Sequence, residues 1–274
     1  MKIFRILLTA ALAATVLTCL SGCAAKLNYD YDNADKFMPG DREIAEEIEN
    51  IDIDYMAGDV TLKGSRTDKV IVKETSKTDI DDDLKVHTWV DGKTLHVKYC
   101  AAVKGMSIRS IKDLEKTLEI TVPVEATLSN LSIDDSAGDV SVDCSAENYD
   151  IDVSAGNITI NQHGESDQIK LDDSAGDIDV TAENISKLFI DMSAGSLKLS
   201  ADKAPEESEI DISAGDIELY LPEKADLTLA VDISAGEFNS EIPFVKKGDD
   251  YILGNGQNRM EIDASAGDIN IIKK

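Results

Sequence analysis

Residues 210–219 read IDISAGDIEL, and this stretch decides the fold. Ile210 and Ile212 alternate with polar residues, which predicts a β-strand with one buried face. After Gly215 the apolar alternation resumes at Ile217 with the opposite parity. A one-residue slip of this kind would turn the buried face outward unless the backbone bends there. We therefore expect Ser-Ala-Gly-Asp to form a corner between two strands.

The same motif recurs along the chain, with its glycine at Gly58, Gly138, Gly156, Gly176, Gly195, Gly215, Gly236 and Gly267. Most copies lie about 20 residues apart, a period typical of solenoid repeats. The position four residues before the glycine is always aspartate: Asp54, Asp134, Asp152, Asp172, Asp191, Asp211, Asp232 and Asp263. The position directly after the glycine is polar: Asp59, Asp139, Asn157, Asp177, Ser196, Asp216, Glu237 and Asp268. The repeat therefore predicts two acidic columns, one on each side of the corner.

Successive repeats keep equivalent residues in register when they coil in parallel, whereas antiparallel hairpins do not. Parallel β-connections are almost always right-handed. The sequence thus predicts an all-β fold, a right-handed parallel β-solenoid with rungs of about 20 residues.

The predicted solenoid domain spans residues 46–274, with regular rungs over 131–274. The corner motif is missing for most of 46–130, and we interpret the strand-like runs there as degenerate rungs; a separate small β-domain is the alternative. The excursion 246–258 is predicted to fold over the last rung, with the C-terminal lysines at 273–274 discouraging edge pairing.

The N-terminus predicts a processing signal. Residues 1–22 contain Lys2 and Arg5 followed by an apolar run too short to span a membrane. The run ends in Leu-Ser-Gly-Cys, which resembles the lipobox of bacterial lipoproteins and implies lipidation of Cys23. The alternative is an ordinary secretory signal in which this cysteine is incidental. Acyl chains on Cys23 would hold the protein to the cell membrane on its extracytoplasmic face, with residues 23–45 as a polar tether.

The charge balance excludes nucleic acid as a partner. The 274 residues carry 54 acidic and 27 basic side chains, a formal net charge of -27, whereas phosphate backbones are bound by clustered Lys and Arg. Cys100 and Cys144 remain in the processed chain, as a disulfide or as two buried thiols.

Two interpretations of the acidic columns stay open. Stacked carboxylates repel one another, so we expect serine hydroxyls or corner amides to bond the first column. A row of Ca²⁺ ions is the alternative, because hard cations take carboxylate oxygens. The second column suits turn capping, since Asp, Asn and Ser commonly accept hydrogen bonds from nearby main-chain amides.

No catalytic, cofactor-binding or metal-binding residues are predicted. His87, His96 and His163 are scattered, and every recurrent carboxylate belongs to a column. Phosphate-loop, nucleophile-elbow and metal-ligand spacings do not occur. The sequence therefore favours a protein that is not an enzyme.

The iterated IDxSAGDI motif, the Val-Pro at 122–123 and the ending 254–269 resemble the putative adhesin family, β-strand-repeat domains of unknown function in bacterial envelope lipoproteins. The resemblance implies a non-catalytic, adhesin-like binding or scaffold surface in the cell envelope, with a protein or glycan partner. An accessory protein of an envelope-stress signalling system is the alternative, and a glycan-active β-helix enzyme is a third reading.

Overall fold

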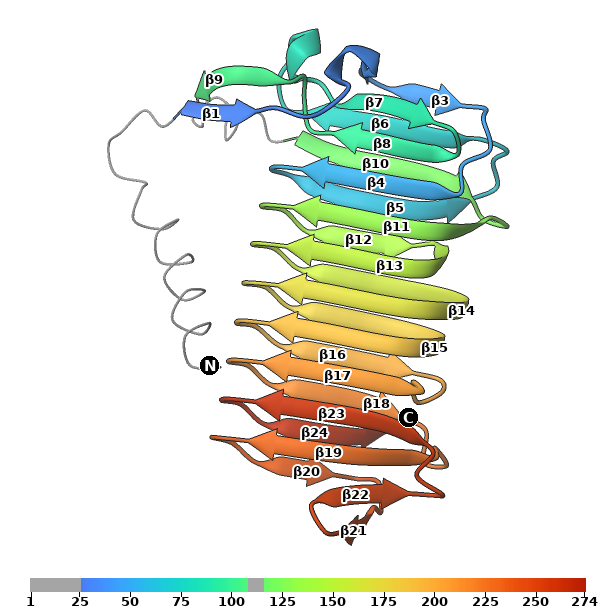
Figure 1. Ribbon diagram of the computed structural model, residues 1–274, viewed down its shortest axis with the longest axis vertical. Helices are drawn as coiled ribbons and strands as arrows, with labels where there is room; N and C mark the ends of the chain where they lie inside the picture. The colour runs from blue at the N-terminus through green and yellow to red at the C-terminus, as the bar shows by residue number, and fades with distance from the viewer. Residues whose placement is uncertain (1–25, 108–115) are drawn as a thin grey trace.

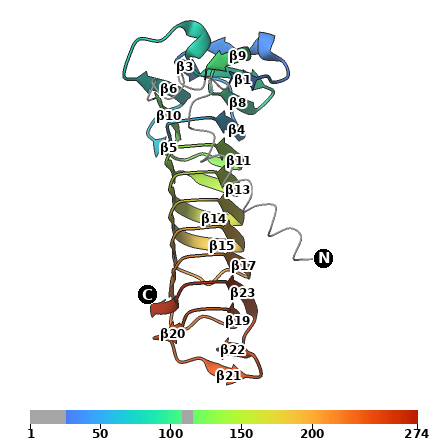
Figure 2. The same cartoon turned by 90° about the vertical axis from the view of Figure 1, so that its left-hand side faces the viewer.

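The computed structural model describes residues 26–107 and 116–274, and nearly all of its regular structure is β-strand. Every described strand except β1 (Lys26–Tyr29) and β9 (Val103–Ser107) belongs to one hydrogen-bonded sheet. The sheet is wound so that two stacks of strands face each other across a narrow core (Figures 1 and 2). In the described part of the chain, no helix is long and apolar enough to cross a membrane.

The strands that lead into the corners form one stack, which we call the entry face. In spatial order it contains β8 (Thr94–Lys98), β4 (Asn50–Tyr55), β11 (Thr127–Asp135), β13 (Ser145–Val153), the second halves of β14 (Ile158–Asp173) and β15 (Ile178–Met192), then β17 (Glu207–Ile212), β23 (Asn258–Ala264) and β19 (Leu227–Ile233).

The strands that leave the corners form the exit face. In spatial order it contains β10 (Lys116–Pro123), β5 (Asp59–Ser65), β12 (Val140–Asp143), the first halves of β14 and β15, then β16 (Leu197–Ala201), β18 (Ile217–Leu221), β24 (Ile269–Lys273) and β20 (Phe238–Ser240).

Parallel pairing places equivalent residues of neighbouring repeats beside one another. On the entry face Asp152 pairs with Asp172, and Asp172 pairs with Asp191. On the exit face Ile158 pairs with Ile178. The prediction that the repeat residues stack in columns is confirmed.

The sheet is mixed, so the prediction of parallel pairing throughout is wrong at both ends. The end elements are β2 (Met38–Pro39), β3 (Arg42–Ile44), β6 (Val70–Ser76), β7 (His87–Asp91), β21 (Val245–Lys247), β22 (Asp250–Leu253) and the short 3₁₀ helices Ala34–Lys36 and Asp82–Leu84. At the end of the stack next to β8 and β10, which we call the proximal end, β6 is antiparallel to β3 and β10, and β7 is antiparallel to β2 and β8. At the opposite end, next to β19 and β20, which we call the distal end, β22 is antiparallel to β19 and β21. Antiparallel strands of this kind cover sheet edges that would otherwise be open to other chains.

The last repeat in the sequence is not the last rung in space. Strands β23 and β24 lie between the β17–β18 rung and the β19–β20 rung (Figure 1). The C-terminal lysines therefore do not protect a free edge as predicted. Lys273 pairs instead with Glu223 at 2.6 Å, and Lys274 with Asp202 at 2.6 Å.

The core lies between the two faces and consists of stacked aliphatic side chains. Ile151, Leu171 and Ile210 are fully buried in one such stack. Cys100 and Cys144 are buried as well, and both carry free thiols. Of the two readings left open for this pair, the structure has two buried thiols.

The segment predicted as a polar tether, 23–45, is packed on the proximal end of the stack in its described part. Strand β1 pairs with β9, and the Tyr31 hydroxyl donates to the Cys100 carbonyl at 2.9 Å. Tyr31 and Phe37 rings lie 5.0 Å apart, and Phe37 lies 5.7 Å from Trp89. The polar composition of the segment concealed these aromatic contacts, which supply the apolar burial that orders it.

Candidate functional site

The first acidic column runs along the outside of the entry face. Its order in space is Asp54, Asp134, Asp152, Asp172, Asp191, Asp211, Asp263 and Asp232. Burial against the sheet, together with neighbouring carboxylates, raises the pKa of Asp134, Asp152 and Asp191 above the ordinary range. The column is therefore a line of mutually repelling charges.

Lysines compensate part of this repulsion. Lys98 lies 3.0 Å from Asp54, and Lys170 lies 2.6 Å from Asp172. The main chain beside the column bonds from rung to rung, since the Ser154 N–H donates to the carbonyl of Asp135 at 3.0 Å. No group of three or more His, Cys, Asp or Glu side chains within 26–107 and 116–274 is arranged to hold a metal ion. The geometry thus offers no support for a Ca²⁺ row.

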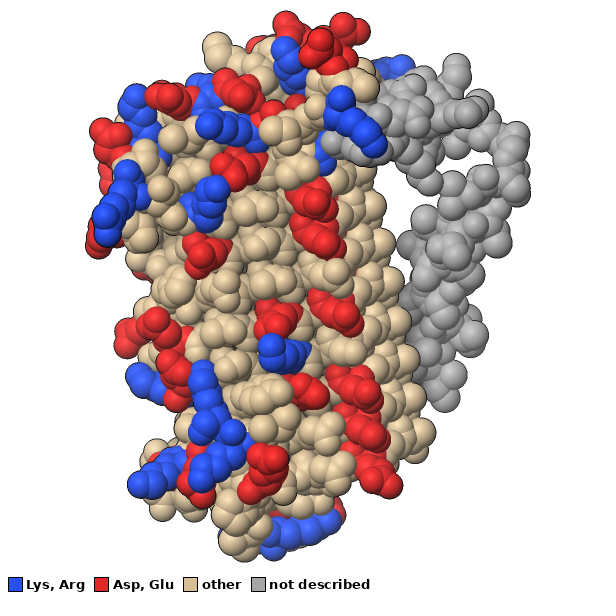
Figure 3. Space-filling model, turned by 180° about the vertical axis from the view of Figure 1, so that it is seen from behind, with Lys and Arg blue, Asp and Glu red and all other residues tan. Residues whose placement is uncertain are grey.

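The second acidic column follows the corner on the exit face, where Figure 3 shows a line of acidic side chains along one edge. Here six of the eight side chains, all but Ser196 and Glu237, accept the main-chain N–H of the equivalent residue on the next rung. Asp139 accepts from Asn157 at 2.8 Å, Asn157 accepts from Asp177 at 2.9 Å, and Asp177 accepts from Ser196 at 2.8 Å. The predicted capping of main-chain amides is confirmed, with the amide supplied by the neighbouring rung.

The corner glycines also stack, and their spacing leaves no room for a side chain. A Cβ on Gly176 would lie 1.8 Å from the carbonyl oxygen of Gly156, and one on Gly195 would lie 1.7 Å from that of Gly176. Gly195 also has φ +135°, which L-residues rarely adopt. Rungs approach one another this closely only because the corner residue is glycine.

Two buried carboxyl groups in the regular rungs were not expected from the sequence. Asp135 and Asp173 point into the core just before their corners. In each, Oδ1 accepts the N–H two residues on, from Ala137 at 3.2 Å and Ala175 at 3.0 Å, while Oδ2 has no partner in the described residues. Burial raises the pKa of Asp135 to about 7 and that of Asp173 to about 6.

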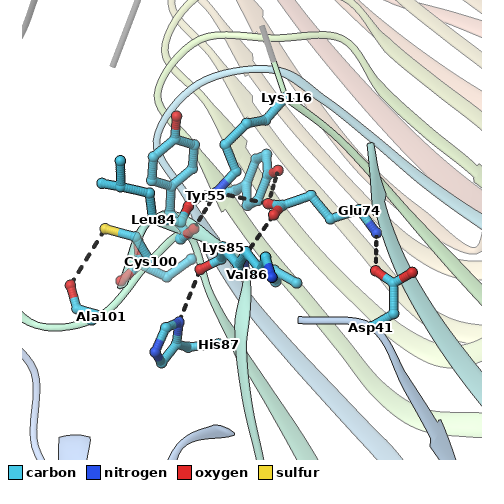
Figure 4. A network of polar contacts seen from close by, with 12 residues as sticks. Asp41, Tyr55, Glu74, Leu84, Lys85, Val86, His87, Cys100, Ala101 and Lys116 are labelled. Atoms are coloured by element: carbon cyan, nitrogen blue, oxygen red, sulfur yellow. Dashed lines mark hydrogen bonds and ion pairs between the residues drawn. The ribbon is translucent and has the colours of Figure 1, made fainter. Parts of the chain in front are cut away.

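A buried ion pair closes the proximal end of the core (Figure 4). Lys116 Nζ lies 2.7 Å from Glu74 Oε1 and also donates to the carbonyls of Leu84 at 2.7 Å and Tyr99 at 2.5 Å. It sits 3.8 Å from the centroid of the Tyr99 ring. Burial lowers the pKa of Lys116, and the Glu74 carboxylate opposes that shift. All three ammonium protons thus have acceptors inside the protein.

Glu74 is satisfied from three sides. Besides Lys116, the Tyr55 hydroxyl donates to Oε1 at 3.1 Å, and the Val86 N–H donates to Oε2 at 2.9 Å. The carboxylate is 4% exposed, so a substrate could not reach it without local opening. This cluster joins β4, β6 and β10 and has the character of a structural polar network.

The histidines do not converge on a common site. His87 Nδ1 lies 2.9 Å from the Lys85 carbonyl, His96 Nδ1 lies 2.8 Å from Asp52, and His163 Nε2 lies 2.7 Å from Asp143. Each sits on a different strand beside a local partner. Burial raises the pKa of the Cys144 thiol to about 12 and that of Cys100 to about 11, which disfavours the nucleophilic thiolate.

The lipidation site predicted at Cys23 lies outside the described residues. A hollow on the described surface lies at the distal end. It has a volume of about 670 Å³. The hollow lies against β17, β23, β19 and the β21–β22 hairpin, and its side chains are mostly carboxylates.

Comparison with known protein families identifies the family of this chain. The family model described as Toastrack DUF4097 matches residues 48–163 and, overlapping them, 124–272. This chain is a member of the Toastrack family. The family resemblance found in the repeat motif is therefore confirmed, and the chain is an all-β Toastrack-like repeat protein.

Comparison with solved structures finds several similar chains from bacteria. A putative adhesin from Bacteroides fragilis is 17% identical, with a TM-score of 0.53 over 86% of this chain and 97% of that chain, which shows a shared fold. A putative cell adhesion protein from Clostridium sporogenes is 13% identical, with a TM-score of 0.40 over 86% and 100%. A putative lipid binding protein from Parabacteroides distasonis is 16% identical, with a TM-score of 0.43 over 86% and 97%. No curated protein matches the sequence.

Proposed function

We propose that this Toastrack protein is a lipid-anchored, extracytoplasmic, right-handed parallel β-solenoid whose faces serve as a non-catalytic binding or scaffold surface in the bacterial cell envelope. The observation that carries the proposal is that the repeated polar residues lie in columns. The exit-face column bonds one rung to the next, and the entry-face column lines a flat outer surface. Such residues build an extended wall and are not gathered into a reaction centre.

The position of the first ordered strand supports attachment at the proximal end. Strand β1 begins at Lys26, three residues after Cys23. Three residues span about 10 Å at most. Lipid on Cys23 would therefore hold the proximal end of the stack close to the membrane surface, with the distal end pointing away.

The chemistry of the described side chains supports a binding role over catalysis. General acid–base chemistry needs a titratable pair placed around a substrate. The strongly shifted carboxyl groups, Asp135 and Asp173, are buried and lie on different rungs. The Glu74–Lys116 pair is buried and fully bonded. The exposed surface offers sheet faces and open hollows, of which the distal one is lined mostly by carboxylates.

Attachment is tested with two cysteine variants of the full chain. We expect the wild type to incorporate an alkyne-tagged fatty acid and to partition with membranes, and Cys23→Ser to lose both properties. Cys19→Ser is the matched control, because it changes a neighbouring cysteine inside the predicted signal and should retain both. Equal labelling of wild type and Cys23→Ser would refute lipid attachment at this site.

Binding is tested by cross-linking the intact protein in its own membranes and purifying it. Retention on cell-wall material or on a surface protein supports the scaffold proposal. One dominant sensor protein would instead support a role in envelope-stress signalling. Turnover on a glycan panel, lost on changing a single acidic residue, would overturn the non-catalytic proposal.

A further inference from the structure

The distal end of the stack finishes in a corner that has no following rung. Because β23 and β24 are inserted inside the stack, the terminal rung is made of β19 and β20. Its corner glycine, Gly236, is exposed, whereas the other seven corner glycines are partly buried. The stack of rungs therefore ends at this corner without a further rung to cover it.

The series of hydrogen bonds that joins each corner to the next ends at this corner. The N–H of each inner corner glycine donates to the alanine carbonyl of the following rung, as from Gly215 to Ala266 at 2.9 Å and from Gly267 to Ala235 at 2.9 Å. At the terminal corner the described residues give the Gly236 N–H no such acceptor, and β20 pairs only with β24. Main-chain groups of the terminal corner thus face an empty rung position.

The adjoining strand is open over the same stretch. Strand β22 pairs with β19 only from Leu227 to Ala230, so residues 231–233 are paired with β23 alone. Val231, Ile233 and Phe238 are only partly buried. The equivalent Ile210, Ile212 and Ile217 of an inner rung are at most 2% exposed. An edge of about eight residues, 231–238, therefore has unpaired main chain beside an incompletely covered core.

The charge around this edge determines which kind of peptide segment could bind there. The hollow of about 670 Å³ borders the edge at Val231, and its carboxylates include Asp232, Asp249, Asp250 and Glu261. Among the described residues that line the hollow, Lys246 is the only basic one. A basic segment would meet complementary charge, whereas an acidic one would be repelled.

We propose that the edge formed by residues 231–238 binds an extended, basic peptide segment of a partner protein, which adds to the sheet as a further strand. Main-chain hydrogen bonds to the edge supply affinity, and alternate side chains reach the carboxylate-lined hollow. The proposal rests on the proposed binding function and specifies its site and ligand class.

The test uses the full-length protein in detergent and two nine-residue fluorescent peptides, one of alternating valine and lysine and one of alternating valine and glutamate. We expect the lysine peptide to bind and the glutamate peptide to bind at least tenfold more weakly. Methylation of alternate main-chain nitrogens of the lysine peptide should weaken binding at least tenfold, because it removes the donors of a strand. If the methylated peptide binds equally well, the contact is general charge attraction and the strand-addition proposal is overturned.

Two matched variants locate the site. Asp232→Lys lies at the open edge, and Asp191→Lys makes the same change in the same column on an inner rung. We expect Asp232→Lys to weaken binding of the lysine peptide at least tenfold and Asp191→Lys less than threefold, with unchanged urea midpoints showing that both fold. Hydrogen exchange should slow on peptide binding at residues 231–238 and not at the inner corners. Equal effects of the two variants would overturn the location.

Other outcomes separate this inference from the broader function. If sedimentation shows a dimer that Asp232→Lys dissociates, the edge binds a second copy and the peptide assignment is wrong. If Asp232→Lys still captures the same cross-linked envelope partner while the lysine peptide fails to bind, the binding function stands and this site does not. If wild type and variant capture nothing and bind no peptide, both proposals fail.

Discussion

Buried carboxyl groups occur in two regions of the molecule, with different surroundings. In the regular rungs, Asp135 has one main-chain donor and one oxygen without a partner among the described residues. At the proximal end, Glu74 is bonded by Lys116, a tyrosine hydroxyl and a main-chain amide. The pKa of Asp135 is raised to about 7, which favours the neutral form. The comparison teaches that two carboxyl groups buried in one protein can differ widely in the number of donors that the surrounding elements supply.

The difference in donors follows from the difference in architecture. A regular rung uses its main-chain groups to bond the rungs above and below, so few remain for an inward side chain. The proximal end breaks the repeat with β6 and β7, and the segment around Val86 brings free amides and carbonyls to the core. The irregular end can therefore hold an ion pair that a regular rung has no groups to satisfy.

The largest expected effect comes from breaking the regularity of the corners. In Gly176→Ala the new Cβ would meet the Gly156 carbonyl oxygen at 1.8 Å. Since two main chains must separate, we expect a loss of about 4 kcal/mol or more in the free energy of unfolding. Gly164→Ala, with φ +76° and no atom within 4 Å of the new Cβ, is the control and should lose about 1–2 kcal/mol. Urea unfolding followed by circular dichroism measures both, and similar losses would contradict the stacking argument.

The second effect tests the ion pair of the proximal end. Lys116→Met leaves the Glu74 carboxylate buried without its cation, which we expect to cost about 3–5 kcal/mol. The double variant Lys116→Met, Glu74→Leu removes both charges and should recover most of that loss, because no unpaired charge remains. A double-mutant cycle in urea gives the coupling. Additive losses would show that the pair is held by packing and not by mutual compensation.

Both kinds of buried charge had a signal in the sequence. Glu74 follows Val70 and Val72 at the same parity, and Lys116 precedes Leu118 and Ile120 at the same parity. Each therefore occupies an inward position of its strand. Asp135 and Asp173 likewise share parity with the aliphatic residue two positions earlier, which marks them as inward positions.

The repeat predicted the columns, the corners and the parallel register. Equivalent residues at a fixed spacing occupy the same position on successive rungs, so their alignment in the sequence gives their alignment in the stack. The sequence could not predict that 258–273 would be inserted ahead of 227–240, since that order depends on which rung fits between which neighbours. It also missed the ordering of 26–39, where a few aromatic contacts outweigh a polar composition. Local patterns fix a rung, whereas the order of rungs is set by non-local pairing.

The third effect is a pH dependence of stability that comes from Asp135 in the regular rungs. The folded pKa of Asp135, about 7, exceeds its unfolded value near 3.8. The folded state therefore binds this proton more tightly, so its contribution is full below the unfolded pKa and is lost as pH rises toward 7. We expect wild-type stability to fall by roughly 2–3 kcal/mol between pH 5 and pH 8 from this group alone.

The variant Asp135→Val introduces the residue type that the neighbouring rung has at the equivalent position, where Val153 pairs with Asp135. We expect it to remove most of this pH dependence and to be more stable than wild type at pH 8. Urea midpoints at pH 5, 6, 7 and 8 provide the measurement, with Gly164→Ala, which changes no titratable group, expected to keep the wild-type fall. A variant profile as steep as that of the wild type would mean that Asp135 is not the group responsible.

The smallest effect distinguishes the two acidic columns on the outside of the regular rungs. Asp177 accepts the Ser196 N–H at 2.8 Å, so Asp177→Ala should cost about 0.5–1 kcal/mol, and Asp177→Asn should restore most of that loss by keeping the acceptor. Burial against the sheet, together with neighbouring carboxylates, raises the pKa of Asp152 on the entry face. Asp152→Asn should therefore change stability by less than about 0.5 kcal/mol, in the stabilising direction. Urea midpoints at low and high salt measure these changes. An entry-face carboxylate that proved as costly to remove as Asp177 would show that its column also bonds the rungs together, leaving less of that surface free for a partner.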